Sequence, residues 1–453
     1  MTNSQVSLVS ASATRVLGEY DHRFSIEEDG GFAILYGPNG VGKTRFLETI
    51  HAISRLNGAS LIRLPFEKAK LVYSDGSSLE ATRDSNFDAA TDEEWQSSAS
   101  VEITLKRKGA KPVKWSYGDD DFDEWVRMSL PYQPIGDGFW EDPGDGEIVH
   151  TDELRDRYRR RSPNPNKAPD VMQEFVREVP SFLIETQRLR IEQSQRGARP
   201  QAWRSPSGAK PRRQHTSRIT EQAATIRKLV NDAQTEHSRI TQQLDRTFPN
   251  RVLETNADEL QLDAADIRKR YNDQNSFRSR LGRVASVALD DALSLPERRL
   301  DDWELKLLNL YLDDADLKLA PFEELLQKIE LLEQIINSRL LNKQLQVTDG
   351  DGLFVQRKGS GRSISLDSLS SGEQHEIIVM IDLLFNVPSG AVVLIDEPEI
   401  SLHIVWQLAF IPDVKRIAAL AGFRFVVATH SPQIINDEWD RAFRLGPPEE
   451  AFA

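Results

Sequence analysis

Eight residues near the start of the chain fit the phosphate-binding pattern G-x-x-x-x-G-K-[ST]. They are Gly37, Pro38, Asn39, Gly40, Val41, Gly42, Lys43 and Thr44. Glycines let the backbone curl so that its N–H groups face phosphate oxygens, and a following helix presents its positive end. Lys43 would reach the β- and γ-phosphates, and Thr44 would give its hydroxyl to Mg²⁺. A chance glycine turn is the alternative, but apolar Phe32–Leu35 precedes the pattern and a helix from Lys43 to about Arg55 is predicted after it, which is the context that the motif requires.

Two carboxylates follow an apolar run near the other end of the chain. Residues 391–395 are all apolar, and Asp396 and Glu397 come directly after them. Ligands of parallel sheets bind at the carboxyl ends of strands, so these acids are candidates to act on the same nucleotide. Asp396 would hold Mg²⁺ through water, and Glu397 would orient and polarise the attacking water, a general-base contribution of about 10²–10⁴ in rate.

A third motif lies 22 residues before Asp396, counted from its last residue. It reads Leu369, Ser370, Ser371, Gly372, Glu373 and Gln374, ahead of a predicted helix from His375 to Phe385. Ser370 and the backbone N–H groups of Ser371, Gly372 and Glu373 would then lie at a helix N-terminus, where anions bind. Taken alone, the hexapeptide could be an ordinary helix cap.

Three further residues are candidates by position. His430 ends the apolar run 423–429 and is predicted to lie at the γ-phosphate, although a lone histidine is more often structural. His403 is a weaker candidate, because it could pack near an interface between copies. Gln187 follows the apolar Phe182–Ile184 and is either a Mg²⁺- and water-sensing glutamine or a polar residue that ends an edge strand.

Composition narrows the class of protein. The 453 residues include 57 Lys and Arg, 71 Asp and Glu and no cysteine, which gives a formal charge of −14. The lack of cysteine excludes a disulfide framework, a Cys-ligated metal and a thiol nucleophile, and it favours the reducing cytoplasm. No apolar stretch approaches the roughly 18 residues of a membrane span, so we expect no membrane partner.

The elements that must position these motifs occupy the two ends and the middle of the chain. Short alternating runs between Ala59 and Tyr117 predict an antiparallel β subdomain. The segment Gly118–Ile148, with ten acids against Arg127, is predicted to be a solvated loop region. The stretch Arg188–Arg218, with nine basic residues against Glu192, is predicted to be a flexible linker and a candidate nucleic-acid surface.

Two heptad-like series predict a helical insertion in which two helices pair as a coiled-coil hairpin. The first series is Ile219, Ala223, Ile226, Val230, Ala233, His237, Ile240 and Leu244, and the second is Phe322, Leu325, Ile329, Leu332, Ile336 and Leu340. Pro249 is expected to end the first helix and Pro321 to begin the second, with further helices between them. His237 is expected to be a tolerated polar position in the seam.

The predicted fold class is α/β, and the order of the three motifs resembles that of P-loop NTPases of ABC/SMC type. Residues 1–195 would form the N-terminal half of the ATPase head with the β subdomain, 196–350 the helical insertion with its basic linker, and 351–453 the C-terminal half of the head.

The stretch Leu394–His403 and the stretch Ala428–Ile435 resemble the SMC-like, ABC-type AAA ATPases of bacterial anti-phage defence. That group includes the ATPase subunits of the PARIS and Septu systems and the ATPase half of OLD-family nucleases, with the PARIS type preferred because the insertion is short. The resemblance covers roughly the first 60 and last 100 residues. Ile404 stands where the family usually has proline, and Ser371 stands where transporter cassettes have glycine, which points away from transporters.

The resemblance implies a function with ATP and Mg²⁺. Ser370 of one copy would contact the γ-phosphate held by another, so that ATP binding drives homo-oligomerisation. The chain would be a sensor or scaffold that answers a phage-encoded trigger and controls a separate TOPRIM or HNH nuclease. We expect that nuclease to be another polypeptide, because only 23 residues follow His430 and the eight histidines form no H-x-x-H or H-E-x-x-H pair. The alternative is an SMC-like DNA-binding ATPase of repair or end recognition, and a transporter cassette is a distant third.

Overall fold

The computed structural model describes residues 6–27, 31–84, 100–118, 120–136, 139–144, 146–158, 167–185, 217–254, 263–285 and 295–447. The chain divides into two compact units, one formed by Met1–Arg190 with Val387–Ala453 and the other by Ile191–Asn386. The predicted functional boundaries at 195 and 350 stay a prediction. Within the described residues, no helix combines the length and apolar composition that a bilayer crossing requires.

A five-stranded parallel sheet lies at the centre of the first unit. Its order is β11 (Ser181–Glu185), β15 (Val392–Asp396), β16 (Arg424–Thr429), β3 (Phe32–Tyr36) and β17 (Ala442–Arg444). Every residue of β15 is buried, as are the first four of β3, which is typical of strands covered on both faces. The register pairs Asp396 with Ala428 and Ala428 with Leu35, so the ends that carry the sequence motifs meet at one edge.

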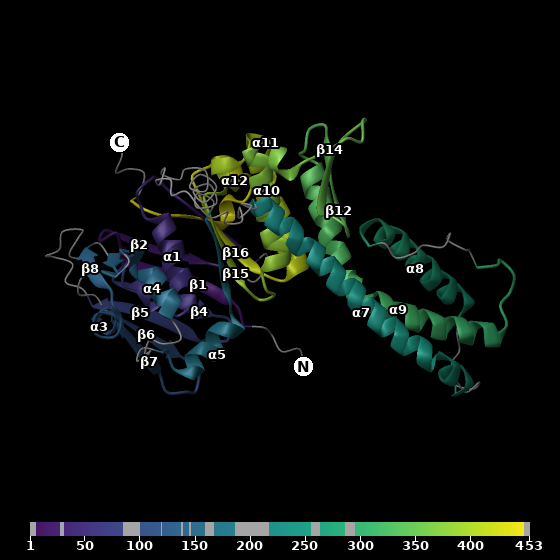
Figure 1. Cartoon of the computed structure of the whole chain (residues 1–453), viewed down its shortest axis with the longest axis horizontal. Helices are drawn as coiled ribbons and strands as arrows, with labels where there is room; N and C mark the ends of the chain where they lie inside the picture. Colours follow the sequence, from purple (N-terminus) through teal and green to yellow (C-terminus); the bar gives the residue numbers. More distant parts are fainter. Residues whose placement is uncertain are drawn as a thin grey trace. The chain divides into compact units, whose positions relative to one another are not determined.

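A six-stranded antiparallel sheet forms the second layer of this unit, as Figure 1 shows. Its order is β2 (Tyr20–Ser25), β1 (Leu8–Val16), β4 (Lys68–Tyr73), β5 (Ser78–Asp84), β6 (Ser100–Lys106) and β7 (Val113–Gly118). The predicted β subdomain is therefore present, and β1 and β2 extend it. Helix α1 (Lys43–Ser54) contacts strands of both sheets, and its Phe46, Leu47 and Ile50 belong to their shared core.

Several other elements of the unit connect these sheets or cover them. They are the helices α2 (Gly58–Leu61), α5 (Asp170–Glu178), α11 (Ile404–Ala421) and α12 (Pro432–Ile435), and the 3₁₀ turns Pro398–Ser401 and Trp439–Arg441.

The expectation that Gly118–Ile148 is a solvated loop is wrong. The segment contains α3 (Asp120–Ser129), β8 (Gln133–Gly136), β9 (Phe139–Glu141) and β10 (Ile148–His150), followed by α4 (Thr151–Tyr158). Apolar residues spaced among the acids form a small core, composed of Val126, Tyr132, Trp140, Val149 and Leu154. Trp140 Nε1 donates to Thr151 Oγ1 at 2.8 Å, so the buried indole keeps a partner.

We predict that His51 makes the first unit sensitive to acid. Burial, with a smaller contribution from the charge of Arg55, lowers the pKa of His51 to about 4, against about 6.5 in an unfolded chain. The unfolded state therefore binds a proton at His51 more readily than the folded state does. The stabilising contribution of neutral His51 is complete above pH 6.5 and is lost as the pH falls towards 4. Between pH 7 and 5 the His51→Gln variant should lose about 1–2 kcal/mol less stability than wild type in urea titrations. Equal losses in both proteins would contradict this.

The second unit contains three long helices, α7 (Arg218–Glu254), α8 (Ala264–Val284) and α9 (Asp302–Asn337). α7 and α9 lie alongside each other, and α8 packs on α9 (Figure 1). The pairing is antiparallel, because Asp245 bonds to Lys318 whereas His237, earlier in α7, packs on Phe322, later in α9. His237 lies in this seam as predicted, with its Nδ1 2.7 Å from the Lys318 carbonyl oxygen.

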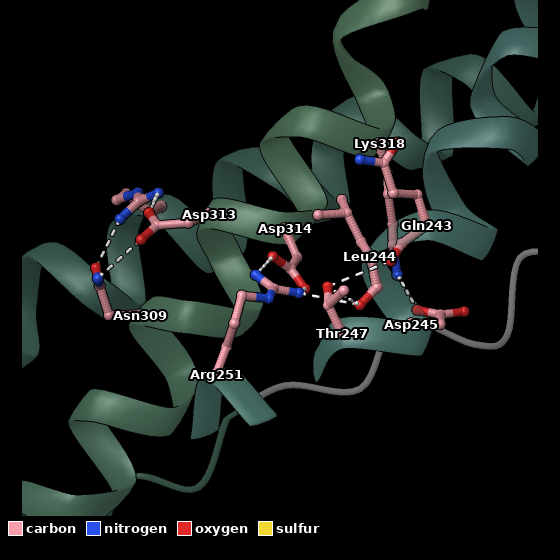
Figure 2. A network of polar contacts seen from close by, with 10 residues as sticks. Gln243, Leu244, Asp245, Thr247, Arg251, Asn309, Asp313, Asp314 and Lys318 are labelled. Carbon is pink, nitrogen blue, oxygen red and sulfur yellow. Dashed lines mark hydrogen bonds and ion pairs between the residues drawn. The ribbon is translucent and has the colours of Figure 1, made fainter. Parts of the chain in front are cut away.

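Both prolines lie inside these helices, which corrects the predicted ends. Pro249 is within α7 and Pro321 within α9. In the turn before Pro249, two side chains donate to the backbone: the Leu244 carbonyl accepts from Arg251 Nη2 at 3.1 Å and from Thr247 Oγ1 at 3.2 Å (Figure 2). A proline has no N–H for the carbonyl four residues earlier, here that of Asp245, and these side-chain bonds to the neighbouring Leu244 carbonyl add contacts in the turn that Pro249 weakens.

We predict that Asp314 fixes the register of the α7–α9 pair. The buried Asp314 accepts from Arg251 Nη2 at 2.7 Å, and Figure 2 shows the two side chains meeting between the helices. Asp314→Ala should cost about 2 kcal/mol in urea unfolding, because the partly buried guanidinium then loses its counter-ion. Asp232→Ala, at an exposed position of α7, is the control and should stay within about 0.5 kcal/mol. An unchanged midpoint for Asp314→Ala would contradict the assignment.

A small sheet and one further helix complete the second unit. The sheet contains β12 (Lys343–Thr348), β13 (Gly352–Arg357) and β14 (Ser363–Ile364) in that order. A 3₁₀ turn at Leu366–Ser368 leads to α10 (Ser371–Ile381), which continues as a π-helical turn, Asp382–Asn386. The start of α10 is the third motif of the sequence.

Candidate functional site

The glycine-rich loop from Gly37 to Gly42 joins β3 to α1. Gly42 has φ 85° and is the N-cap of α1, and a Cβ there would come within 2.8 Å of Val16 Cγ1. At Gly37 a Cβ would lie 2.3 Å from the Leu445 carbonyl oxygen. Only glycine fits both positions, so the sequence determines the curl that brings the N-terminus of α1 to the edge of the parallel sheet.

Lys43, the first residue of α1, is buried with its ammonium turned back over the loop. Nζ donates to the carbonyl oxygens of Gly37 and Pro38, each at 3.0 Å, and to His430 Nε2 at 2.6 Å. Burial lowers the pKa of Lys43, while the carboxylates of Glu397, Asp396 and Glu399 oppose that shift. The cation therefore lies among carbonyl dipoles and three acids, at the point where the loop would hold a phosphate.

Thr44 and Asp396 come together although 352 positions separate them. Thr44 Oγ1 donates to Asp396 Oδ2 at 2.8 Å, and Asp396 is 6% exposed at the end of β15. A Mg²⁺ that takes most of its ligands from phosphates and water needs only one or two oxygen donors from the protein. The Thr44 hydroxyl and the Asp396 carboxylate provide such a pair. The donors present therefore fit this ion. No group of three or more His, Asp or Glu side chains with metal-binding geometry occurs among the described residues.

Glu397 and His430 face each other at the ends of neighbouring strands. His430 Nε2 lies 3.3 Å from Glu397 Oε1, and the two side chains are 29% and 18% exposed. Glu397 has φ 46°, a left-handed conformation that is strained for a residue with a Cβ. Its backbone N–H donates to the Ala428 carbonyl at 2.8 Å, which ties the turn after β15 to β16.

Two further residues support this site without having been predicted. Glu399 Oε1 accepts from the backbone N–H of His430 at 2.6 Å, which fixes the turn that carries the imidazole. His22, 2% exposed on β2, has Nε2 2.7 Å from the Val41 carbonyl oxygen of the loop. Neither residue has a motif of its own, and only the proximity of Glu399 to Glu397 in the sequence could have drawn attention to it.

The structure thus brings together Lys43, Thr44, Asp396, Glu397 and His430, all in the first unit. Gln187 lies outside the described residues, as do residues 188–216 of the basic stretch. His403 is the N-cap of α11, where its side chain accepts from the Val405 backbone N–H.

The Leu369–Gln374 motif lies in the second unit, at the start of α10. Ser370 is the N-cap, with its Oγ accepting from the Glu373 backbone N–H at 3.3 Å, and Glu373 Oε2 accepts from the Ser370 backbone N–H at 2.8 Å. This reciprocal pair is a capping box. Helix cap and anion site are compatible here, because Ser370 is exposed at the positive end of the helix.

The sequence profile of a protein family matches residues 32–436. That family is described as "AAA domain, putative AbiEii toxin, Type IV TA system". Because the match covers all three strands of the site and everything between them, the chain belongs to this family of AAA ATPases. The fold is accordingly that of a P-loop NTPase, α/β in class, with an antiparallel sheet and a helical insertion.

Known proteins resemble this chain more distantly. A segment is 31% identical over 134 residues to the UvrABC system protein A of Aquifex aeolicus (strain VF5), covering 28% of this chain and 13% of that protein's length. The Smc head domain of Pyrococcus furiosus, solved with an extended coiled coil and bound to the C-terminal domain of ScpA, aligns over 95% of this chain and 91% of its own, at 12% identity and a TM-score of 0.35. The SMC head domain from Thermotoga maritima aligns over 98% and 99%, at 10% identity and a TM-score of 0.33.

Proposed function

We propose that this chain binds ATP at the edge of its parallel sheet and hydrolyses it by in-line attack of water on the γ-phosphate. The observation that supports this most strongly is the meeting of Lys43, the Thr44–Asp396 pair and the Glu397–His430 pair at the carboxyl ends of three neighbouring strands. Each residue type matches one requirement of phosphoryl transfer, and chain segments about 350 residues apart supply them.

Each residue of this site has a separate role in the proposed reaction. The loop N–H groups and Lys43 bind the β- and γ-phosphates, with phosphate oxygens competing for the ammonium against the Gly37 and Pro38 carbonyls. Thr44 and Asp396 would hold Mg²⁺, which would supply positive charge to offset the negative charge of the phosphates. Glu397 takes a proton from the attacking water, and His430 donates to the γ-phosphate. Gln187 stays a predicted sensor of water and Mg²⁺.

In this proposal the site is completed by a second copy of the chain, whose Ser370, with the N–H groups of Ser371, Gly372 and Glu373, contacts the γ-phosphate. The test is complementation. Lys43→Ala and Ser370→Arg should each be inactive alone, since one lacks its phosphate ligand and the other blocks the signature. Mixed in equal amounts they should regain turnover, up to about a quarter of wild type for independent sites, because each mixed dimer has one intact site. If the mixture stays inactive while both variants fold, the two-copy model fails.

We further propose that hydrolysis serves anti-phage defence, as a sensor or scaffold that holds a separate nuclease and answers a phage-encoded trigger. The family description, with its toxin and toxin–antitoxin terms, supports this role. A PARIS-type system is preferred. Co-expression with the neighbouring open reading frame tests it: a TOPRIM or HNH protein should co-purify with wild type in an ATP-dependent way. Its absence from the complex, with ATP turnover intact, would contradict effector control.

The alternative is an SMC-like DNA-acting ATPase, which the nine basic residues between Arg188 and Arg218 favour. The likeness of one segment to a UvrABC system protein is consistent with it. DNA binding that falls steeply with salt and stimulates hydrolysis would support this reading over effector control.

A further inference from the structure

One lysine lies behind the capping box of α10. Lys343, the first residue of β12, donates through Nζ to both carboxylate oxygens of Glu373, at 2.9 Å to Oε1 and 2.8 Å to Oε2. The same carboxylate accepts from the Ser370 hydroxyl, with 3.0 Å between Ser370 Oγ and Glu373 Oε2. Lys343, Glu373 and Ser370 therefore form one connected chain of polar contacts that ends at the exposed serine.

The charges in this chain raise a problem for phosphate binding. A helix N-terminus attracts anions, but Glu373 places a full negative charge one hydrogen bond from Ser370 Oγ. A triphosphate approaching Ser370 would be repelled by that charge unless something cancels it. Lys343 cancels it, since its ammonium contacts both oxygens and the side chains of Lys343 and Glu373 are only 26% and 13% exposed.

The serine's single proton leads to the same requirement. In the structure the Ser370 hydroxyl donates to Glu373, whereas a bound phosphate would need that proton. A carboxylate already bonded to an ammonium at both oxygens is a weaker acceptor than a free one. With Lys343 in place, the serine can turn its proton to a phosphate while the Ser370 and Glu373 backbone N–H bonds keep the cap formed.

We propose that Lys343 is a positioning residue of the composite ATP site: it neutralises Glu373 so that Ser370 can bind the γ-phosphate held by another copy. This role rests on the proposed function, in which that phosphate is bound between two chains. Lys343 itself does not touch the nucleotide.

Lys343 is held in place by the end of the helical insertion. Asn337, the last residue of α9, exchanges two hydrogen bonds with the backbone of Leu345, and Glu333 Oε1 accepts from the Val347 N–H at 2.8 Å. The left-handed Asn342 turns the chain directly before Lys343, and its carbonyl accepts from the Lys358 N–H. The position of the ammonium is thus fixed by β12 and α9 rather than by Glu373 alone.

The experiment uses the full chain in a Glu397→Gln background, which should accumulate the ATP-bound assembly, with light scattering after size exclusion as the readout. Lys343→Met should raise the ATP concentration for half-maximal assembly about 10- to 100-fold, as expected for an unscreened like charge beside the phosphates. Glu373→Gln removes the charge that Lys343 neutralises while its amide oxygen can still accept from the Ser370 backbone N–H, so it serves as the reference for the double variant. The double variant Lys343→Met/Glu373→Gln should return to the Glu373→Gln level, and Lys343→Arg should assemble normally.

Two controls separate this role from a structural one. ATP binding by the isolated chain and the urea midpoint should be the same in all variants, and added NaCl should shrink the Lys343→Met defect. A double variant as poor as Lys343→Met, or a defect in assembly that matches a loss of stability, would overturn the proposal. If Glu397→Gln alone does not assemble with ATP, the proposed two-copy function fails first and this role fails with it.

Discussion

Glu397→Gln should lower ATP turnover by about 10²–10⁴-fold while the protein still binds ATP. Glutamine has nearly the shape of glutamate, so the left-handed turn after β15 and its bond to Ala428 can persist. What is lost is the carboxylate that accepts the proton of the attacking water. Phosphate release measures turnover, and nucleotide retained after desalting measures binding.

The matched control is Glu102→Gln on β6, an exposed glutamate of the same unit that pairs with Lys114. It should hydrolyse ATP at the wild-type rate. A Glu397→Gln variant that turns over ATP within a few-fold of this control would remove Glu397 from the mechanism.

Lys43→Ala should weaken ATP binding by about 10²-fold or more, because a charge-assisted contact to phosphate disappears from a buried site. The loss should be greater for ATP than for AMP, which lacks the phosphates that this ammonium would reach. Isothermal titration with each nucleotide measures the difference.

Lys70→Ala, on an exposed position of β4, is the control for general charge effects and should bind ATP normally. The urea midpoint must also be compared, since Lys43 contacts two loop carbonyls and His430 in the structure itself. A folded Lys43→Ala protein that binds ATP with wild-type affinity would contradict the assignment of the glycine-rich loop as the phosphate-binding site.

The elements of the site could be predicted where local patterns are strong. Phe32–Leu35 and residues 392–395 are uninterrupted apolar runs, and all of these residues are buried, in β3 and β15 respectively. The strand order could not be predicted, because the pairing of β3 with β16 and β17 depends on contacts across some 400 positions. Helix ends were misjudged at Pro249 and Pro321, where tertiary contacts such as Arg251–Asp314 outweigh the local preference.

The prediction of a solvated loop at Gly118–Ile148 was wrong because it relied on the number of acidic residues. The charges are real, but Trp140 and Val149 alternate with them and meet in a core, and burial of a few large apolar side chains is enough to order a short segment. Glu399 could not be predicted for a different reason. It accepts from the backbone N–H of His430, and no pattern of side chains in the sequence indicates a contact with a backbone group. Lys343 was missed because its partner lies 30 positions away.

The order of strands in the parallel sheet has a consequence for synthesis of the protein. β3 is made some 400 residues before its two neighbours in the sheet, β16 and β17. Its edges therefore stay unpaired until β16 and β17 have been made, and the unit formed by residues 191–386, which is compact by itself, can fold first. A nascent chain would carry Lys43 and Thr44 long before Asp396 and His430, so we expect the proposed site to be complete only after the strands that carry the latter two have been made. Until then the exposed edges of β3 make the unfinished chain a substrate for chaperones and prone to aggregation.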